Sequence, residues 1–246
     1  MSKIDWQVRL GLTLIVASII VYGFHFLIFD DLHHILIYLI GDIGFLPIEV
    51  LIVSLIIHRI LSARERKIRL EKLNMVIGAF FSEVGIWLLA FFSDFDPSLS
   101  KIKQNLIVSN DWNEEEFLRV EKLLKIYSYT VDMGKINLKD LASYLVDKRD
   151  FMLRLLENPT LLEHESFTEL LRAVFHLTEE LENRKSLKNL PESDVEHLQG
   201  DIVRAYGLLV VEWLDYMRHL KENYPYLFSL AMRTNPFDTH ASPIVR

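Results

Sequence analysis

The chain has 246 residues, a formal net charge of −7, seven prolines and no cysteine. Without cysteine it has no disulfides, thiolate metal sites or cysteine nucleophiles. Half of its residues are hydrophobic and a quarter are charged, which excludes wholesale disorder and collagen-like repeats. Its mean hydropathy of +0.18 is high for a soluble domain, which indicates that part of the chain lies in an apolar environment.

The apolar residues are concentrated near the N-terminus. Leu10–Phe29 contains no ionisable side chain except His25 and Tyr22. Twenty helical residues, at about 1.5 Å each, cover the roughly 30 Å hydrocarbon core of a bilayer. A second run, Ile35–Leu61, is also long enough to cross. Because the linker is short, the two segments predict an antiparallel transmembrane hairpin. A cleaved signal peptide is less favoured, since the first run exceeds the usual ~7–15 residues and no small-residue cleavage site follows.

The basic residues around these segments predict their orientation, because Lys and Arg near membrane ends stay on the cytoplasmic side. Lys3 and Arg9 precede the first segment, and the linker has no Lys or Arg. The second segment is followed by a basic cluster of Arg59, Arg64, Arg66, Lys67, Arg69 and Lys72. We therefore expect a multi-pass protein of the cell inner (plasma) membrane with both termini cytoplasmic. The cluster either contacts anionic lipid head groups or serves only as the orientation signal, which is its more ordinary role.

A third apolar stretch, Met75–Phe92, has two interpretations. It is at the short end for a membrane span, and Ser82 and Glu83 lie at its centre. A third crossing would also place the acidic remainder of the chain outside the cell. We favour a helix that lies near the inner membrane face or is buried in the cytoplasmic domain.

The remainder of the chain is acidic and helical in pattern. From Val76 onward, 19 Lys and Arg against 27 Asp and Glu give −8, whereas residues 1–75, with 8 against 7, give +1. This charge and the lack of a basic patch with aromatic residues argue against nucleic acid as a partner. The absence of β-alternation predicts an all-α fold, in which a bundle of four to six helices follows the hairpin.

Helix start signals divide this bundle. Asn113 or Asp111 is expected to cap a helix through Tyr127, and Asn137 a helix that reaches Leu156. Ser166 with Glu169 and Ser193 with Glu196 match the capping-box pattern. The second box is expected to open the longest helix of this part, from Val195 to about Asn223, which is nearly continuously apolar, and so buried on most faces, over residues 208–214.

Two carboxylates in the second apolar segment are the strongest functional lead, because an ionisable side chain within a span costs several kcal/mol. Glu49 follows Asp42 by seven residues, so both lie on one stripe about 10.5 Å apart along the helix. Identical helices assembled with this stripe inward would stack two carboxylate rings, as in cation-selective pores. Alternatively, Asp42 pairs with His25 at similar depth and Glu49 is protonated. A proton relay or an intramembrane metal enzyme is a third, less favoured interpretation.

Other chemistry is weakly indicated. His33 and His34 beside two aspartates in the linker are metal-capable, but such a cluster is more often a polar turn. The histidines of the acidic part invite a search for a helical di-iron site, yet no Glu-x-x-His pairs are present. No nucleophile elbow, Walker or zincin motif is found. We therefore expect no enzymatic activity, no cofactor and no metal site.

These patterns divide the chain into residues 1–61, the hairpin; 62–94, a basic juxtamembrane helix and a membrane-proximal apolar helix; 95–237, the acidic domain; and 238–246, a disordered tail. The first functional hypothesis is a homo-oligomeric cation-conducting or ion-handling protein that uses Asp42 and Glu49. The alternative is a membrane-anchored interaction or signalling module whose acidic domain binds a cytoplasmic protein partner. The lipid bilayer is a partner in both hypotheses.

Overall fold

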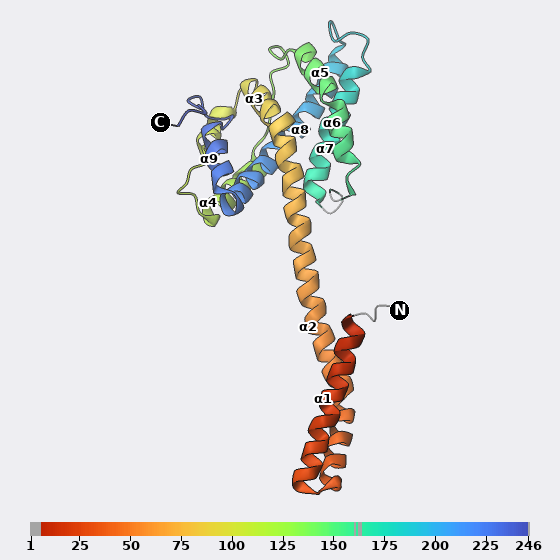
Figure 1. The fold of residues 1–246 in the computed structure, drawn as a ribbon. Coiled ribbons are helices and arrows are strands. Elements are labelled where there is room, and N and C mark those ends of the chain that lie inside the picture. The colour runs from red at the N-terminus through yellow and green to blue at the C-terminus, as the bar shows by residue number, and fades with distance from the viewer. Residues whose placement is uncertain (1–5, 160, 162–163, 246) are drawn as a thin grey trace. The chain divides into compact units, whose positions relative to one another are not determined.

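A computed structural model describes residues 6–159, 161 and 164–245, apart from the side chains of residues 7, 63 and 66–73. In this described part every regular element is a helix, which confirms the predicted all-α fold (Figure 1). The chain divides into two compact units, Met1–Arg66 and Lys67–Arg246. We refer to the second unit as the helical domain.

The first unit contains helix α1, Trp6–Phe29, and the start of helix α2, Leu32–Phe80. Asp30 adopts the left-handed conformation, with φ of 46°, and its N–H donates to Phe26 O at 2.8 Å, which ends α1. Asp31 Oδ1 then accepts from His34 N at 3.0 Å at the start of α2. The two aspartates therefore reverse the chain direction, and the linker has the structure of a polar turn.

Three helical segments are long and apolar enough to cross a membrane, namely Val8–Phe29, Leu32–Ser62 and Asn74–Asp94. The first two differ from the third in burial. None of the residues in their most apolar windows is buried, against 44% in the third. A contiguous surface of exposed Leu, Ile, Val and Phe on this scale is typical of contact with lipid or with another protein.

The third apolar segment is part of the core of the helical domain, one of the placements that we expected. It comprises the end of α2, a π-helical turn η1, Phe81–Gly85, and helix α3, Ile86–Asp94. Its Val84, Leu88 and Phe92 are fully buried. Glu83 instead faces the surface, where it pairs with Lys148 at 3.2 Å. The Glu83 carbonyl accepts a hydrogen bond from Tyr144 Oη at 2.8 Å, so the polar centre of the segment has partners within the domain.

The rest of the helical domain is arranged around helix α8, Glu192–Asn223, which packs against α3, α4, α7 and α9 (Figure 1). The apolar centre of α8 is buried on most faces, as predicted. Helices α5 and α6 pack against α7. The other elements in this part are η2, Leu99–Lys101; η3, Lys103–Leu106; α4, Glu114–Ile126; α5, Leu138–Asp147; α6, Arg149–Leu156; α7, Glu165–Glu182; and α9, Pro225–Arg233.

The helix caps agree only in part with the sequence patterns. Asn113 and Asn137 cap α4 and α5, as predicted. The two capping boxes are wrong, because α7 and α8 each begin earlier than the predicted serine. The cap of α7 is His164, whose Nδ1 accepts from Phe167 N at 3.2 Å. Helix α8 begins after Pro191 and has no side-chain cap.

Two further segments differ from expectation. The helix predicted from Asn137 to Leu156 is divided into α5 and α6 at Lys148, which has φ −90° and ψ −1°. The tail expected to be disordered is described to residue 245 as turns. The N–H of Ser242 donates to Arg233 O at 2.7 Å, so the tail folds back onto the end of α9.

Candidate functional site

The two carboxylates of the second apolar segment lie within one uninterrupted helix. Asp42 and Glu49 are exposed on α2, which continues through Pro47. No hydrogen bond or ion pair with another described side chain is found for either carboxylate. The structure therefore keeps both on the predicted stripe and gives neither a partner among the described residues.

His25 is placed differently from the sequence interpretation. Its ring stacks on that of His34 with centroids 6.0 Å apart, and it shares a small pocket with Tyr22, Ile35 and Tyr38. The turn at residues 30 and 31 is so tight that His25 lies opposite the first turn of α2. In the described part of the chain, no hydrogen bond or ion pair joins His25 to Asp42. The predicted His25–Asp42 pair is therefore not formed.

The basic cluster is only partly within the described side chains. Arg59 and Arg64 are exposed on α2, so their guanidinium groups are available for contact. The side chains of Arg66, Lys67 and Arg69 lie outside the described residues. The lipid head-group contacts expected for these five residues stay a prediction.

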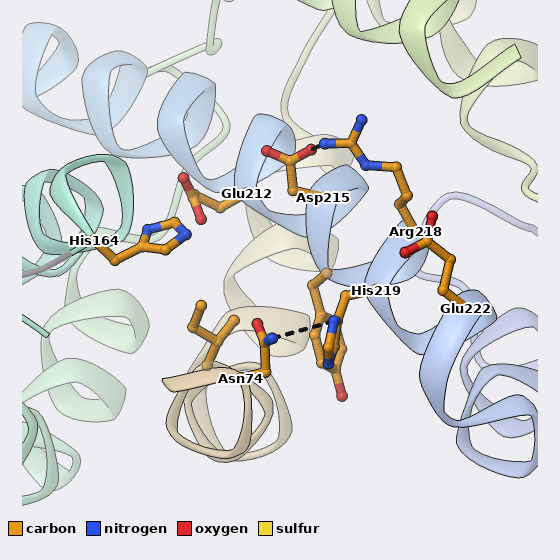
Figure 2. Close-up of a pocket in the computed structure, with 9 residues that line it drawn as sticks. Asn74, His164, Glu212, Asp215, Arg218, His219 and Glu222 are labelled. Atoms are coloured by element: carbon orange, nitrogen blue, oxygen red, sulfur yellow. Dashed lines mark hydrogen bonds and ion pairs between the residues drawn. The ribbon is translucent and has the colours of Figure 1, made fainter. Parts of the chain in front are cut away.

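The helical domain contains a polar cavity that we did not predict from the sequence. It has a volume of about 240 Å³ and is formed by the end of α2, the start of α7 and the C-terminal half of α8 (Figure 2). Its lining is Asn74, Ile77, His164, Glu212, Asp215, Tyr216, Arg218, His219 and Glu222. Three carboxylates, two imidazoles and one guanidinium therefore surround a space of small-molecule size.

Glu212 is the most deeply buried ionisable group of this cavity, at 3% exposed. Burial raises the pKa of its carboxyl to about 7, although a hydrogen bond from Ser166 opposes the shift. Its Oε1 atom is buried and has no hydrogen-bond partner in the described part of the chain. In Figure 2 the Glu212 carboxyl and the His164 ring point toward one another. Glu212 thus presents an unused acceptor, and it changes charge near neutral pH.

His219 presents an unused donor to the same cavity. Its Nδ1 lies 3.1 Å from Asn74 Nδ2 and 3.1 Å from Asn223 Nδ2, and Figure 2 shows the first of these bonds. An amide nitrogen only donates, so Nδ1 is the acceptor and the ring proton is on Nε2. Burial lowers the pKa of His219, which favours this neutral ring. The Nε2 atom is buried without a partner among the described groups.

The remaining charges of the cavity are partly compensated. Arg218 donates to Asp215 at 2.6 Å and to Glu114 at 3.2 Å, so its positive charge is shared by two carboxylates. Burial raises the pKa of Asp215 and lowers the pKa of His164. Both shifts disfavour the charged forms. The lining nevertheless carries more acidic than basic groups, which favours a cationic ligand or a proton.

The signal for this cavity is present in the sequence, but it is a single residue. Glu212 interrupts the nearly continuous apolar run of residues 208–214. A carboxylate in a run that is buried on most faces must itself be buried, and so must have a partner or a function. Asn74 and Ile77 lie on α2 and His164 caps α7, so only the folded structure brings them against the lining residues of α8.

Comparison with known proteins identifies relatives of both units. Residues 69–233 match the family described as "Uncharacterized protein MJ1433, C-terminal helical domain", and residues 2–61 match "MJ1433, N-terminal helical domain". The chain is also 52% identical over 238 residues to uncharacterized protein MJ1433 of Methanocaldococcus jannaschii, which covers 97% of this chain and 96% of that protein. No solved structure matches the chain.

Proposed function

The chain belongs to the MJ1433 family, and we propose that it is a membrane-anchored binding module. In this proposal the N-terminal hairpin spans the bilayer and the helical domain binds a ligand on the cytoplasmic side. The observation that carries the proposal is the contrast in burial. The most apolar windows of the first two segments have no buried residue, whereas the helical domain covers an extensive hydrophobic core of its own.

The cavity supports a ligand-binding role for the helical domain. A buried acceptor at Glu212 Oε1 and a buried donor at His219 Nε2 both lack partners in the described chain. Unsatisfied buried polar groups of this kind cost about 1–3 kcal/mol each, and a ligand that pairs with them recovers this free energy. The acidic lining favours a small ammonium cation that also accepts one hydrogen bond.

The position of Asn74 supports a signalling role for such binding. Asn74 lies on α2, the same helix that carries the second apolar segment, and its amide donates to His219 in the cavity wall. A ligand that binds His219 therefore changes a contact that restrains α2. We propose that the occupied and empty cavity hold the end of α2 differently.

Membrane anchorage is tested by extraction. We expect the full-length chain to stay in the membrane fraction after washing with alkaline carbonate. A fragment that begins at Lys67, the start of the second compact unit, is expected to be soluble, monomeric and helical by circular dichroism. Release of the full-length chain by carbonate would contradict the proposal.

The proposed topology is tested by cysteine labelling, because the chain has no cysteine of its own. We expect Ser2→Cys and Ser62→Cys to react with a membrane-impermeant maleimide only after the cells are opened. His33→Cys in the linker is expected to react in intact cells. Labelling of residue 62 from outside would place the helical domain on the opposite side of the membrane.

The ligand site is tested by thermal unfolding of the full-length chain in detergent at pH 8. We expect ethanolamine to raise the unfolding temperature and acetate to have no effect, because the site favours an ammonium group. Glu212→Gln is expected to abolish the shift, while Glu222→Gln at the exposed rim is expected to reduce it only slightly. Equal shifts in wild type and Glu212→Gln would show that ethanolamine binds elsewhere.

Ion handling is the second candidate function, and it is supported by Asp42 and Glu49, which have no partner in the part of the chain that the structure describes. Carboxylates within a span carry a large cost unless they face water, a cation or a partner. Homo-oligomers with the stripe of α2 inward would supply that environment. A hairpin of two helices encloses no pore by itself, so this candidate requires several copies of the chain.

Cross-linking in native membranes followed by flux measurements tests this candidate. It predicts oligomers of four or more chains, and cation flux in liposomes that is altered by Asp42→Asn and Glu49→Gln while the oligomer persists. Asn110→Asp in the helical domain is a control that adds a charge outside the stripe. A monomer, or flux that neither substitution changes, would exclude this function.

A further inference from the structure

A cluster of two histidines and two carboxylates lies between α7 and α8, outside the cavity. Helix α7 carries His176 and Glu180, and α8 carries His197 and Asp201. Residues four apart lie on the same face of a helix. Because α7 and α8 pack against each other along their length, each helix turns one histidine–carboxylate pair toward the other.

The distances within the cluster have the size expected for ligands of one metal ion. Asp201 Oδ2 lies 3.4 Å from His197 Nε2 and 3.6 Å from His176 Nε2. Glu180 Oε2 lies 3.6 Å from His197 Nε2, and its Oε1 lies 3.8 Å from His176 Nε2. A tetrahedral ion with bonds of about 2.1 Å separates its ligand atoms by roughly 3.4 Å. His176, Glu180 and His197 each place one ligand atom within 4.8 Å of the other two, and Asp201 Oδ2 lies close to both imidazole Nε2 atoms.

The same distances argue against direct hydrogen bonds. An imidazolium that donates to a carboxylate normally lies about 2.7–2.9 Å from it. All four histidine–carboxylate separations exceed 3.3 Å, although the side chains are aimed at one another. A shared ion at the centre of the cluster explains both the convergence and the spacing.

Asp201 provides an independent reason for a cation at this place. The residue is only 5% exposed, and its Oδ2 atom has no hydrogen-bond partner in the described part of the chain. A buried carboxylate without hydrogen bonds needs a cation or must give up its charge. The unpartnered oxygen is the one that faces both imidazole Nε2 atoms.

Arg184 fixes the position of Glu180, the second carboxylate of the cluster. Arg184 donates from Nη1 to Glu180 Oε2 at 2.7 Å and from Nη2 to Asp194 Oδ1 at 2.7 Å. Glu180 and Asp201 together supply two carboxylates, whose charge balances that of a divalent cation.

We propose that His176, Glu180, His197 and Asp201 bind one first-row divalent cation, with Zn²⁺ as the best match in ligand type and geometry. Each helix supplies one histidine and one carboxylate, so the ion fastens α7 to α8 near their connecting loop. From the sequence we expected no metal site, because Glu-x-x-His pairs are absent. The relevant pattern is His-x-x-x-Glu on α7 and His-x-x-x-Asp on α8.

The proposal is tested on the full-length chain in detergent, after metal is removed with a chelator. We expect calorimetry to show one Zn²⁺ per chain, and Co²⁺ to give the intense visible absorption of a tetrahedral site. Asp201→Asn and His197→Gln are expected to weaken Zn²⁺ binding by about 100-fold or more, since even loss of a group that only orients a ligand costs 10–100-fold. Glu179→Gln and His240→Gln alter exposed residues outside the cluster and are expected to bind as wild type.

Unfolding measurements distinguish loss of the site from loss of the fold. Zn²⁺ is expected to raise the unfolding temperature of the wild type but not of Asp201→Asn. Asn preserves the shape of Asp, so we expect this variant to fold without metal at least as stably as the wild type. The proposal is overturned if the wild type does not bind Zn²⁺, if Asp201→Asn binds it equally well, or if Glu212→Gln in the cavity removes the binding instead.

Discussion

Two buried carboxylates of the helical domain, Asp96 and Glu212, have opposite environments. Asp96 is 7% exposed and accepts hydrogen bonds from Ser98 N at 2.8 Å, Tyr127 Oη at 2.8 Å and Thr130 Oγ1 at 3.3 Å. Glu212 is 3% exposed, and one of its oxygens has no partner among the described residues. The fold thus supplies hydrogen-bond donors to the Asp96 carboxylate but leaves one oxygen of Glu212 without a donor.

This difference indicates that Asp96 has a structural role and that Glu212 has a functional role. Asp96 follows α3 and ties the end of this core helix to the segment after α4, so its bonds contribute to stability. Glu212 faces a cavity, and burial raises its pKa to about 7. A protein that keeps a destabilising carboxylate in its interior is expected to use it.

The largest effect is expected from removal of the satisfied carboxylate. Asp96→Ala leaves three donors without an acceptor, and each such loss costs about 1–3 kcal/mol. We expect the free energy of unfolding to fall by about 3–5 kcal/mol in urea titrations followed by circular dichroism. Asp94→Ala, at an exposed position two residues earlier, is the control. Equal losses in both variants would contradict a structural role for Asp96.

Glu212→Gln is expected to act in the opposite direction and to depend on pH. The folded pKa of about 7 exceeds the ordinary value of 4.5, so between these values the folded state binds more protons than the unfolded state. The contribution of Glu212 to stability therefore falls as pH rises from 4.5 to 7. At 1.36 kcal/mol per pKa unit, this loss is about 3 kcal/mol above pH 7.

We accordingly expect Glu212→Gln to match the wild type near pH 4 and to be about 3 kcal/mol more stable near pH 8. Urea titrations at the two pH values measure this difference, and the exposed Glu222→Gln controls for the change in net charge. A gain of the same size at both pH values would show that the pKa of Glu212 in the folded protein is not raised above its ordinary value.

The sequence predicted the elements of the fold better than their ends. Asn113 and Asn137 were identifiable as caps because an Asn just before an apolar helical pattern has one common use. His164 was not identifiable as the cap of α7, since its neighbour Ser166 matches the stronger capping-box pattern. The local pattern is outweighed by packing, because the helix begins where Phe167 and Leu170 are buried.

The sites were less predictable than the fold. Asp42 and Glu49 stand out in the sequence because their neighbours are apolar, and the structure adds only that they lack partners among the described side chains. The cavity and the cluster between α7 and α8 depend instead on which helices pack together. Spacing within one helix is readable from the sequence, whereas the pairing of His176 with Asp201 requires the position of α8 against α7.

The smallest predicted effect concerns a single hydrogen bond of Asp96, the one from Tyr127. Tyr127→Phe removes the hydroxyl that donates to Asp96 Oδ2 but leaves the Ser98 and Thr130 bonds in place. Because a hydrogen bond to a charged group contributes about 1.5–3 kcal/mol and Asp96 keeps other donors, we expect a loss of about 1–2 kcal/mol. Tyr226→Phe, at a residue that is 72% exposed, is expected to have no effect.

A double-mutant cycle then decides whether this loss belongs to the bond. If Tyr127 stabilises the domain through Asp96, Tyr127→Phe is expected to cost little in an Asp96→Ala background. Additive losses would instead show that the Tyr127 hydroxyl stabilises the domain independently of Asp96. Only a small cost in the Asp96→Ala background supports the view that hydrogen bonds from the fold stabilise the Asp96 carboxylate. The Glu212 carboxylate lacks such a set of bonds.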